Sequence, residues 1–373
     1  MGDVQRDVQL AVDQLIEQDA ERGLQVAVYR NGEQIVDAVG GFAADGRPVT
    51  ADSLFHVTST AKGVASTVVH GLAADGILEY DTPVVDLWPQ FGANGKERTT
   101  VRDVLTHSAG VPAVPVGTTP EDLCDWDKMC DLIAGATPWW EPGTRTGYHP
   151  QTYGYLVGEI VRRATGRTIS EETRRRIAAP LGVEEELFFA VPREALGRVA
   201  RHEQPDAMHL TAEMAAQMAG TVPFFRVLDG WTAAPLGALP DAGYCNRVDV
   251  LTAEIPAGGV MSARAIARTY AALLGPVDGV RLLSAQRLRD AASVVVSGED
   301  AVLGFPAKRG LGYDVGFPGP LDSPTLFGMA GSGGTAAYAD PQTGVAIAVA
   351  KNRVTAGDYS TFTAISAVVA KSL

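Results

Sequence analysis

Residues 53–74 have the sequence SLFHVTSTAKGVASTVVHGLAA, in which a short apolar run passes directly into a helical stretch. The junction contains Ser59-Thr60-Ala61-Lys62, the single SxxK sequence of the chain. Helical spacing places Ser59 at the start of a helix expected over 60–75, with Lys62 one turn further along the same face. We therefore predict that the lysine amine reaches the serine hydroxyl.

The Ser59–Lys62 pair has the chemistry of a serine nucleophile and its base. The first N–H groups of a helix lack intrahelical acceptors, so negative charge that develops there is stabilised. A buried lysine loses proton affinity and can then act as a base. The four residues alone are equally compatible with Ser59 as an ordinary helix cap and Lys62 in solvent.

Periodicity and turn residues indicate strands near both ends of the chain and helices between them. An Asn31-Gly32 turn favours a hairpin near the N-terminus. Helices are expected at 4–19, 60–75, 100–106, 151–165, 169–178, 262–274 and about 358–371, and strands at 24–29, 34–39, 53–57, 325–329, 334–340 and 344–350. The region 200–255 shows only weak periodicity.

This order of elements predicts an α+β fold. Strands from both ends would form one antiparallel sheet flanked by the terminal helices, and the helical middle would be an inserted subdomain. We expect one catalytic unit over 1–373, with an α/β part at about 1–58 and 256–373 and a helical part at about 59–255. A small-molecule site is expected in the cleft between the two parts.

Composition restricts the partners. The chain has 46% hydrophobic and 20% charged residues and a formal net charge of −13, which argues against nucleic acid and anionic membrane surfaces. The N-terminal segment is charged and lacks the apolar core of a secretory signal, and no apolar run is long enough to cross a membrane. We expect a cytoplasmic protein with no membrane partner. The oligomeric state is left open.

Cysteine and histidine spacing gives no framework for a metal or cofactor. Cys124, Cys130 and Cys245 form no CxxC pair, so three thiols are expected, with a Cys124–Cys130 bridge left open. The histidines show no HxH or HExxH spacing, and no GxGxxG or GxxxxGK sequence occurs. No metal and no cofactor are therefore expected, and His56 and His107 are interpreted as structural.

Two further segments carry candidate catalytic groups. Tyr148 lies in the turn-rich stretch WWEPGTRTGYHP at 139–150, and a phenol beside a lysine ammonium ionises more easily and can relay a proton. The stretch GMAGSGGT at 328–335 ends a β run, and its glycines allow the backbone to approach a ligand. A backbone N–H there, beside that of Ser59, would form an oxyanion hole. A packed loop tyrosine and a bulged turn are the alternatives.

Together, the SxxK sequence, the WxPGxxxxY loop and the glycine-rich strand resemble the serine β-lactamase-like family, and most closely its class C-like esterases and transacylases. The resemblance extends over nearly the whole chain. It includes LTHSAGVP (105–112), YHPQTYGYLVGEIVRRATG (148–166), PLGV (180–183), PAGGVMSARAIAR (256–268) and ADPQTGVAIAVAKN (339–352). It implies a β-lactamase/transpeptidase-like fold.

The resemblance also implies roles for individual residues. Ser59 corresponds to the nucleophile, Lys62 to the activating lysine and Tyr148 to the general base. The backbone N–H groups of Ser59 and Ser332 correspond to the oxyanion hole. We also expect the substrate to contact His149, Met329, Gly331 and Trp140.

Two positions depart from the family pattern. The usual Tyr-x-Asn is here Tyr148-His149-Pro150, and the usual Lys-Thr-Gly or His-x-Gly is Met329-Ala330-Gly331. The first departure removes an amide that helps to bind β-lactams, and the second removes a cation that would bind a substrate carboxylate. Both favour uncharged esters, thioesters or amides.

The sequence therefore predicts a two-step acyl transfer from a small-molecule donor. The acyl group passes to water, or to an amine or alcohol acceptor as in secondary-metabolite tailoring. We also hypothesise that the aromatic residues Trp139, Trp140, Tyr153 and Trp231 wall the cleft, with the protein core as the alternative place for them.

Parts of the sequence also relate to three other functions. A β-lactamase or D-amino-acid peptidase and a non-catalytic ligand-binding member of the family remain alternatives. A nucleophile elbow at 330–334 is disfavoured, because a β run follows it and every histidine precedes it.

Overall fold

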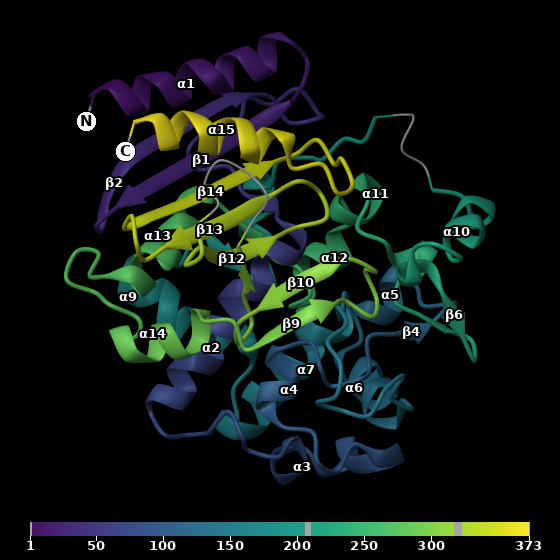
Figure 1. Cartoon of the computed structure of the whole chain (residues 1–373). Coiled ribbons are helices and arrows are strands. Elements are labelled where there is room, and N and C mark those ends of the chain that lie inside the picture. The colour runs from purple at the N-terminus through teal and green to yellow at the C-terminus, as the bar shows by residue number, and fades with distance from the viewer. Residues whose placement is uncertain (1, 206–209, 317–322, 373) are drawn as a thin grey trace.

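The computed structural model describes residues 2–205, 210–316 and 323–372, and it is built around an eight-stranded antiparallel sheet (Figure 1). The strand order is β2-β1-β14-β13-β12-β11-β10-β9. The bounds of these strands are β1 Gly23–Arg30, β2 Glu33–Gly41, β9 Val296–Glu299, β10 Pro306–Arg309, β11 Asp314–Val315, β12 Phe327–Ala330, β13 Ala336–Asp340 and β14 Val345–Lys351.

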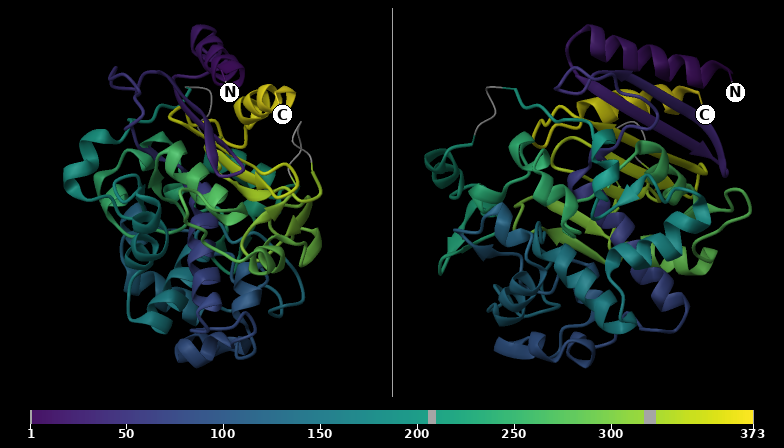
Figure 2. Two further views of the ribbon diagram at one scale, coloured as in Figure 1. Left: turned by 90° about the vertical axis from the view of Figure 1, so that its left-hand side faces the viewer. Right: turned by 180° about the vertical axis from the view of Figure 1, so that it is seen from behind.

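The two ends of the chain meet inside this sheet. Strand β1 pairs with β14 in a register that runs from Leu24 opposite Lys351 to Arg30 opposite Val345. Figure 2 shows the terminal helices α1 (Gly2–Glu17) and α15 (Ser360–Lys371) lying together over one face of the sheet. The α+β class predicted from the sequence is thus confirmed.

The two faces of the main sheet carry side chains of different size. On β14, Ile347 and Val349 face the cluster under α1 and α15, whereas Ala346 and Ala348 belong to the cluster on the opposite face. Successive residues of a strand point to opposite faces, so the bulky and small residues separate. The alanine face allows α13 (Ala263–Leu274) to pack closely against the sheet.

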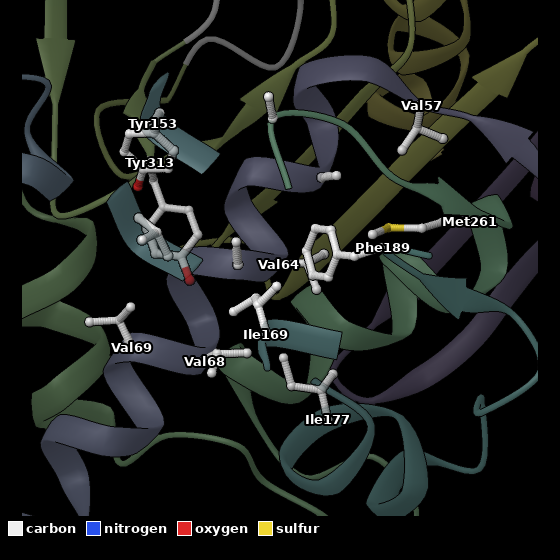
Figure 3. Packing of buried hydrophobic residues seen from close by; sticks show 14 of the residues in the cluster. Val57, Val64, Val68, Val69, Tyr153, Ile169, Ile177, Phe189, Met261 and Tyr313 are labelled. Atoms are coloured by element: carbon white, nitrogen blue, oxygen red, sulfur yellow. The ribbon is translucent and has the colours of Figure 1, made fainter. Parts of the chain in front are cut away.

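Helix α2 (Ala61–Ala74) lies in the main core and fixes the position of Ser59 and Lys62. Its residues Val64 and Val68 belong to one buried cluster with Ile169 and Ile177, part of which is drawn in Figure 3. Nearly every side chain of α2 is buried. Protein interiors are close-packed, so a helix surrounded in this way is a rigid base for reactive groups.

The remaining helices and two small sheets lie outside the main sheet. The helices are α3 Val84–Leu87, α4 Val101–Leu105, α5 Pro120–Leu123, α6 Trp126–Gly135, α7 Thr152–Thr165, α8 Ile169–Thr173, α9 Ala179–Leu181, α10 Ala212–Met218, α11 Ala242–Cys245, α12 Val248–Thr252 and α14 Ala285–Ala292. The small sheets are β3 Phe55–His56, β8 Val260–Met261 and β5 Leu187–Phe188, and β4 Val114–Pro115, β7 Trp231–Thr232 and β6 Val227–Leu228. Within the described residues, no helix is both long and apolar enough to cross a membrane.

Two expected elements differ in detail. The run at 53–57 is strand β3, which pairs with β8 in a small sheet and not with the main sheet. The helix expected over 169–178 is α-helical only as far as Thr173 and continues as a π-helical turn over Arg174–Ala178. Pro180 lacks the N–H that a continuous α-helix would donate to Arg176, which favours this local rearrangement.

Candidate active site

Ser59 lies in a short 3₁₀ turn, Thr58–Thr60, between β3 and α2. Thr58 has a φ of 46°, a left-handed conformation that a β-branched residue rarely adopts. Such strain persists only where surrounding contacts enforce it, and it is concentrated at functional sites. The turn leaves the Ser59 side chain partly exposed, although its neighbours Thr58 and Thr60 are buried.

Lys62 lies against Ser59 as the SxxK spacing predicted. Its Nζ donates to Ser59 Oγ at 2.9 Å and to the carbonyl oxygen of Ala257 at 2.7 Å. The side chain has no exposed surface. Burial lowers the pKa of Lys62 to about 7, and the negative charge of Asp314 opposes that shift only in part. The amine is therefore neutral in a large fraction of molecules near neutral pH.

Tyr148 completes the cluster. Its ring centroid lies 5.4 Å from Lys62 Nζ, and Ser59 lies close enough to the phenol to lower its pKa. Burial raises the pKa of Tyr148 above its ordinary value, and the effect of Ser59 opposes the shift only in part. The direction is opposite to the one expected from a neighbouring ammonium, because desolvation outweighs the nearby charges. Tyr148 is consequently a protonated phenol at neutral pH.

The glycine-rich turn after β12 is fastened to the turn that carries Ser59. Thr335 Oγ1 donates to the carbonyl of Val57 at 2.7 Å, and it lies 2.9 Å from Thr60 Oγ1. A Cβ atom at Gly331 would lie 2.2 Å from Thr58 Oγ1, so only glycine fits there. These contacts bring Ser332 into the same cavity as Ser59.

A cavity of about 270 Å³ opens beside Ser59, Tyr148 and Ser332. None of the described residues that line it is a lysine or an arginine, and Asp241 is the one carboxylate among them. Its walls are mainly apolar and come from the region that gave no clear assignment from sequence: Leu210, Phe224, Phe225, Leu236, Leu239 and Pro240.

None of the four residues expected to contact the substrate, Gly331 included, lines this cavity. His149 is 1% exposed, and its Nε2 accepts the N–H of Val111 at 3.1 Å. Trp140 donates its indole N–H to the carbonyl of Ser108 at 3.2 Å and packs against the loop at Gly147. Met329 is 2% exposed and faces α2. Their side chains are taken up by packing and by backbone hydrogen bonds, so they do not form the cavity wall.

The other aromatic residues proposed as cleft walls lie elsewhere as well. Tyr153 is fully buried, and its hydroxyl lies 2.7 Å from Ser66 Oγ. Trp231 packs against the main hydrophobic core, and Trp139 is absent from the cavity lining. The phenylalanines Phe224 and Phe225 take the place that the sequence assigned to these residues.

Several groups near the site were not predicted. The Ala257 carbonyl, which holds Lys62, is a backbone atom without a sequence signature of its own, although the following Gly258-Gly259 pair marks a close approach. Asp300, Arg309 and Asp314 lie on or beside the short strands β9 to β11. All three cysteines are free thiols, and no cluster of metal-ligating side chains is found among the described residues.

Comparison with known proteins gives matches over nearly the whole chain. The family model described as Beta-lactamase matches residues 9–370. Esterase/beta-lactamase LipL of Mycobacterium tuberculosis is 36% identical over 339 residues, which are 88% of this chain and 76% of that protein.

Two solved structures have the same fold. A family VIII carboxylesterase superposes with a TM-score of 0.87 at 29% identity and covers 98% of this chain and 97% of its own. A penicillin-binding protein homologue from Caulobacter crescentus gives a TM-score of 0.84 at 33% identity, over 100% of this chain and 98% of its own. The resemblance seen in the sequence is confirmed, and the chain belongs to the beta-lactamase family.

Proposed function

We propose that the protein is a serine carboxylesterase that hydrolyses small uncharged esters through an acyl-enzyme on Ser59. The observation that carries the proposal is the desolvated Lys62 amine, with a pKa of about 7, at 2.9 Å from Ser59 Oγ. General acid–base catalysis is most efficient when the pKa of the catalytic group lies near the operating pH. The names of the esterase relatives support the same reaction.

In the acylation step, Ser59 Oγ attacks the ester carbonyl carbon while the neutral amine of Lys62 takes the hydroxyl proton. The carbonyl π electrons move to its oxygen, which the backbone N–H groups of Ser59 and Ser332 would stabilise. The tetrahedral intermediate then expels the alkoxide. The Tyr148 phenol donates its proton to that alkoxide and regains one from the Lys62 ammonium, which returns Lys62 to its neutral form.

In the deacylation step, water takes the place of the departed alcohol. Lys62 accepts a proton from the water as its oxygen attacks the acyl carbon, and the second tetrahedral intermediate expels Ser59 Oγ. Ser59 recovers its proton through Lys62 and Tyr148. The covalent intermediate divides one difficult displacement into two easier steps.

The cavity favours neutral substrates over the carboxylate-bearing ones of a β-lactamase or a D-amino-acid peptidase. No cation lines it among the described residues, and Asp241 would repel a carboxylate. Its apolar walls also disfavour water near the acyl-enzyme. Transfer of the acyl group to an alcohol or amine, as in tailoring of a secondary metabolite, is therefore the second candidate.

The proposal is tested with p-nitrophenyl esters of increasing acyl length and with a fluorophosphonate that labels reactive serines. We expect one label per chain, on Ser59, and loss of both label and turnover in Ser59→Ala with the fold unchanged. A folded protein that neither labels nor turns over any ester would instead be a non-catalytic member of the family. Adding butanol or butylamine and measuring the ratio of acid to transfer product separates hydrolysis from transfer.

A further inference from the structure

The hairpin formed by β9 and β10 lies at the edge of the main sheet, and it is bonded to the loop that carries Tyr148. Ala301 N donates to the carbonyl of Thr146 at 3.0 Å. The Tyr148 backbone N–H lies 3.0 Å from each carboxylate oxygen of Asp300. An edge hairpin distant in sequence thus holds the backbone of a residue that lines the same cavity as Ser59.

Asp300 is fully buried and surrounded by donors. Besides the Tyr148 N–H, its Oδ1 accepts the backbone N–H groups of Val302 at 2.8 Å and Leu303 at 2.7 Å. Its Oδ2 is 2.5 Å from Nη2 of Arg309. Every neighbour that bonds the Asp300 carboxylate is therefore a donor, which a carboxylate satisfies and an amide cannot.

Arg309 is 3% exposed and bonds the same loop from the other side. Its Nη1 donates to Thr146 Oγ1 at 2.7 Å, and Thr146 Oγ1 in turn donates to the carbonyl of Thr106 at 2.9 Å. The guanidinium carbon lies 6.0 Å from the centroid of the Tyr148 ring. Asp300 and Arg309 therefore fix both the backbone and the ring environment of Tyr148.

A contribution to folding stability is a weak explanation for the buried Asp300–Arg309 ion pair. Replacing a buried ion pair by apolar residues is often neutral or stabilising, because desolvation offsets the attraction of the charges. Placement of a catalytic side chain gives a stronger one, since an error of about 1 Å can lower a rate about 100-fold. Apart from bonds within their own hairpin and the ion pair of Arg309 with Asp314, the side chains of the pair bond the segment 146–148.

We propose that Asp300 and Arg309 are positioning residues that hold the Tyr148 phenol against Ser59 for proton transfer. The proposal rests on the proposed function, in which Tyr148 protonates the leaving alkoxide. Neither side chain lines the cavity, so both act through Tyr148 and not on the substrate.

The experiment is a double-mutant cycle between Asp300→Asn and Tyr148→Phe, with kcat and KM for p-nitrophenyl butyrate as the readout. Asp300→Asn should lower kcat about 30- to 100-fold and leave KM within about threefold, because it disturbs placement and not binding. In the Tyr148→Phe background the same change should lower kcat less than about twofold, because there is no phenol left to place.

The matched control is Glu172→Gln. Glu172 is another fully buried carboxylate bonded to arginines, but it lies on α8 and does not line the cavity. It should reduce stability and leave kcat within about twofold. Fluorophosphonate labelling and circular dichroism normalise each rate to the folded fraction. If Asp300→Asn does not fold, Thr146→Val, which removes only the hydroxyl between Arg309 and the loop, should lower kcat about three- to tenfold.

Two results would overturn the proposal. One is a folded Asp300→Asn, or a folded Thr146→Val where the first cannot be obtained, with wild-type kcat. The other is a loss in Asp300→Asn that is equally large in the Tyr148→Phe background. Failure of the proposed function is separate, because full activity in Tyr148→Phe or Ser59→Ala would refute it whatever Asp300 does.

Discussion

Replacement of Gly331 by alanine tests the oxyanion hole through geometry alone. The new Cβ would lie 2.2 Å from Thr58 Oγ1 and 2.5 Å from both Thr335 Oγ1 and the Val57 carbonyl oxygen. Rotation of the Thr58 side chain relieves only one of these contacts, because the Val57 oxygen belongs to the backbone. The turn at Gly331 must therefore move about 1 Å away from the segment Val57–Thr58. The Ser332 N–H moves with it.

The expected cost follows from that displacement. An oxyanion donor is worth about 10²- to 10³-fold in kcat, and a shift of about 1 Å removes most of its hydrogen bond. We expect kcat for p-nitrophenyl butyrate to fall about 100-fold, which is about 2.7 kcal/mol in activation free energy. KM should change little, because the cavity walls do not include Gly331.

Gly333→Ala is the matched control. A Cβ there would meet its nearest neighbours at 3.7 Å or more, which is ordinary contact. We expect kcat within about threefold of wild type and an unchanged melting temperature. Equal rates for Gly331→Ala and Gly333→Ala, with both proteins folded, would refute the placement of the Ser332 N–H at the reacting carbonyl.

Two further predictions concern pH and chain length. The pKa of Lys62 is about 7, and the neutral amine is the active form. A plot of log kcat/KM against pH should therefore rise with unit slope below about pH 7 and level off above it. A profile that stays flat from pH 5 to 9 would exclude Lys62 as the base. Phe224→Ala should lower kcat/KM for a hexanoate ester about tenfold, because the acyl chain loses about half of the burial energy of a phenylalanine contact, about 1.4 kcal/mol. The value of kcat/KM for the acetate ester should change less than twofold. Equal losses for both esters would show that Phe224 does not contact the acyl chain.

The placement of Lys62 beside Ser59 could be predicted from the sequence, because it depends on residues three apart on one helix. The i, i+3 spacing of Ser59 and Lys62 on a helix determines that their side chains lie side by side. The Asn31-Gly32 turn and the alternating runs around it gave the N-terminal hairpin, which the structure has at β1 and β2. These features depend on neighbours a few residues apart, and such spacing is visible in one sequence.

Features that depend on distant contacts were missed. Strands β9 and β10 are short and largely exposed, so they lack the apolar alternation that marks a strand, and Asp300 and Arg309 gave no signal. Substrate contact was expected for Met329 and Trp140 from their positions in the sequence motifs. Met329 instead packs against α2, and Trp140 donates a hydrogen bond to the Ser108 carbonyl, so neither side chain lines the cavity. Many of the apolar cavity residues come from 210–240, where irregular turns leave no regular hydrophobic periodicity in the sequence.

The pairing of β1 with β14 has a consequence for how the enzyme is made. Strand β1 ends at Arg30 and its partner strand β14 begins at Val345, so a long stretch of chain is synthesised between them. At typical translation rates the apolar edge of β1 waits for tens of seconds without a neighbour. Ser59 likewise precedes Ser332 by most of the chain. A chain that stalls before β12 therefore carries Ser59 without Ser332 and exposes a strand edge prone to aggregation. In the proposed mechanism such a chain also lacks an oxyanion donor, so acyl-enzyme formation before Ser332 is synthesised is unfavourable.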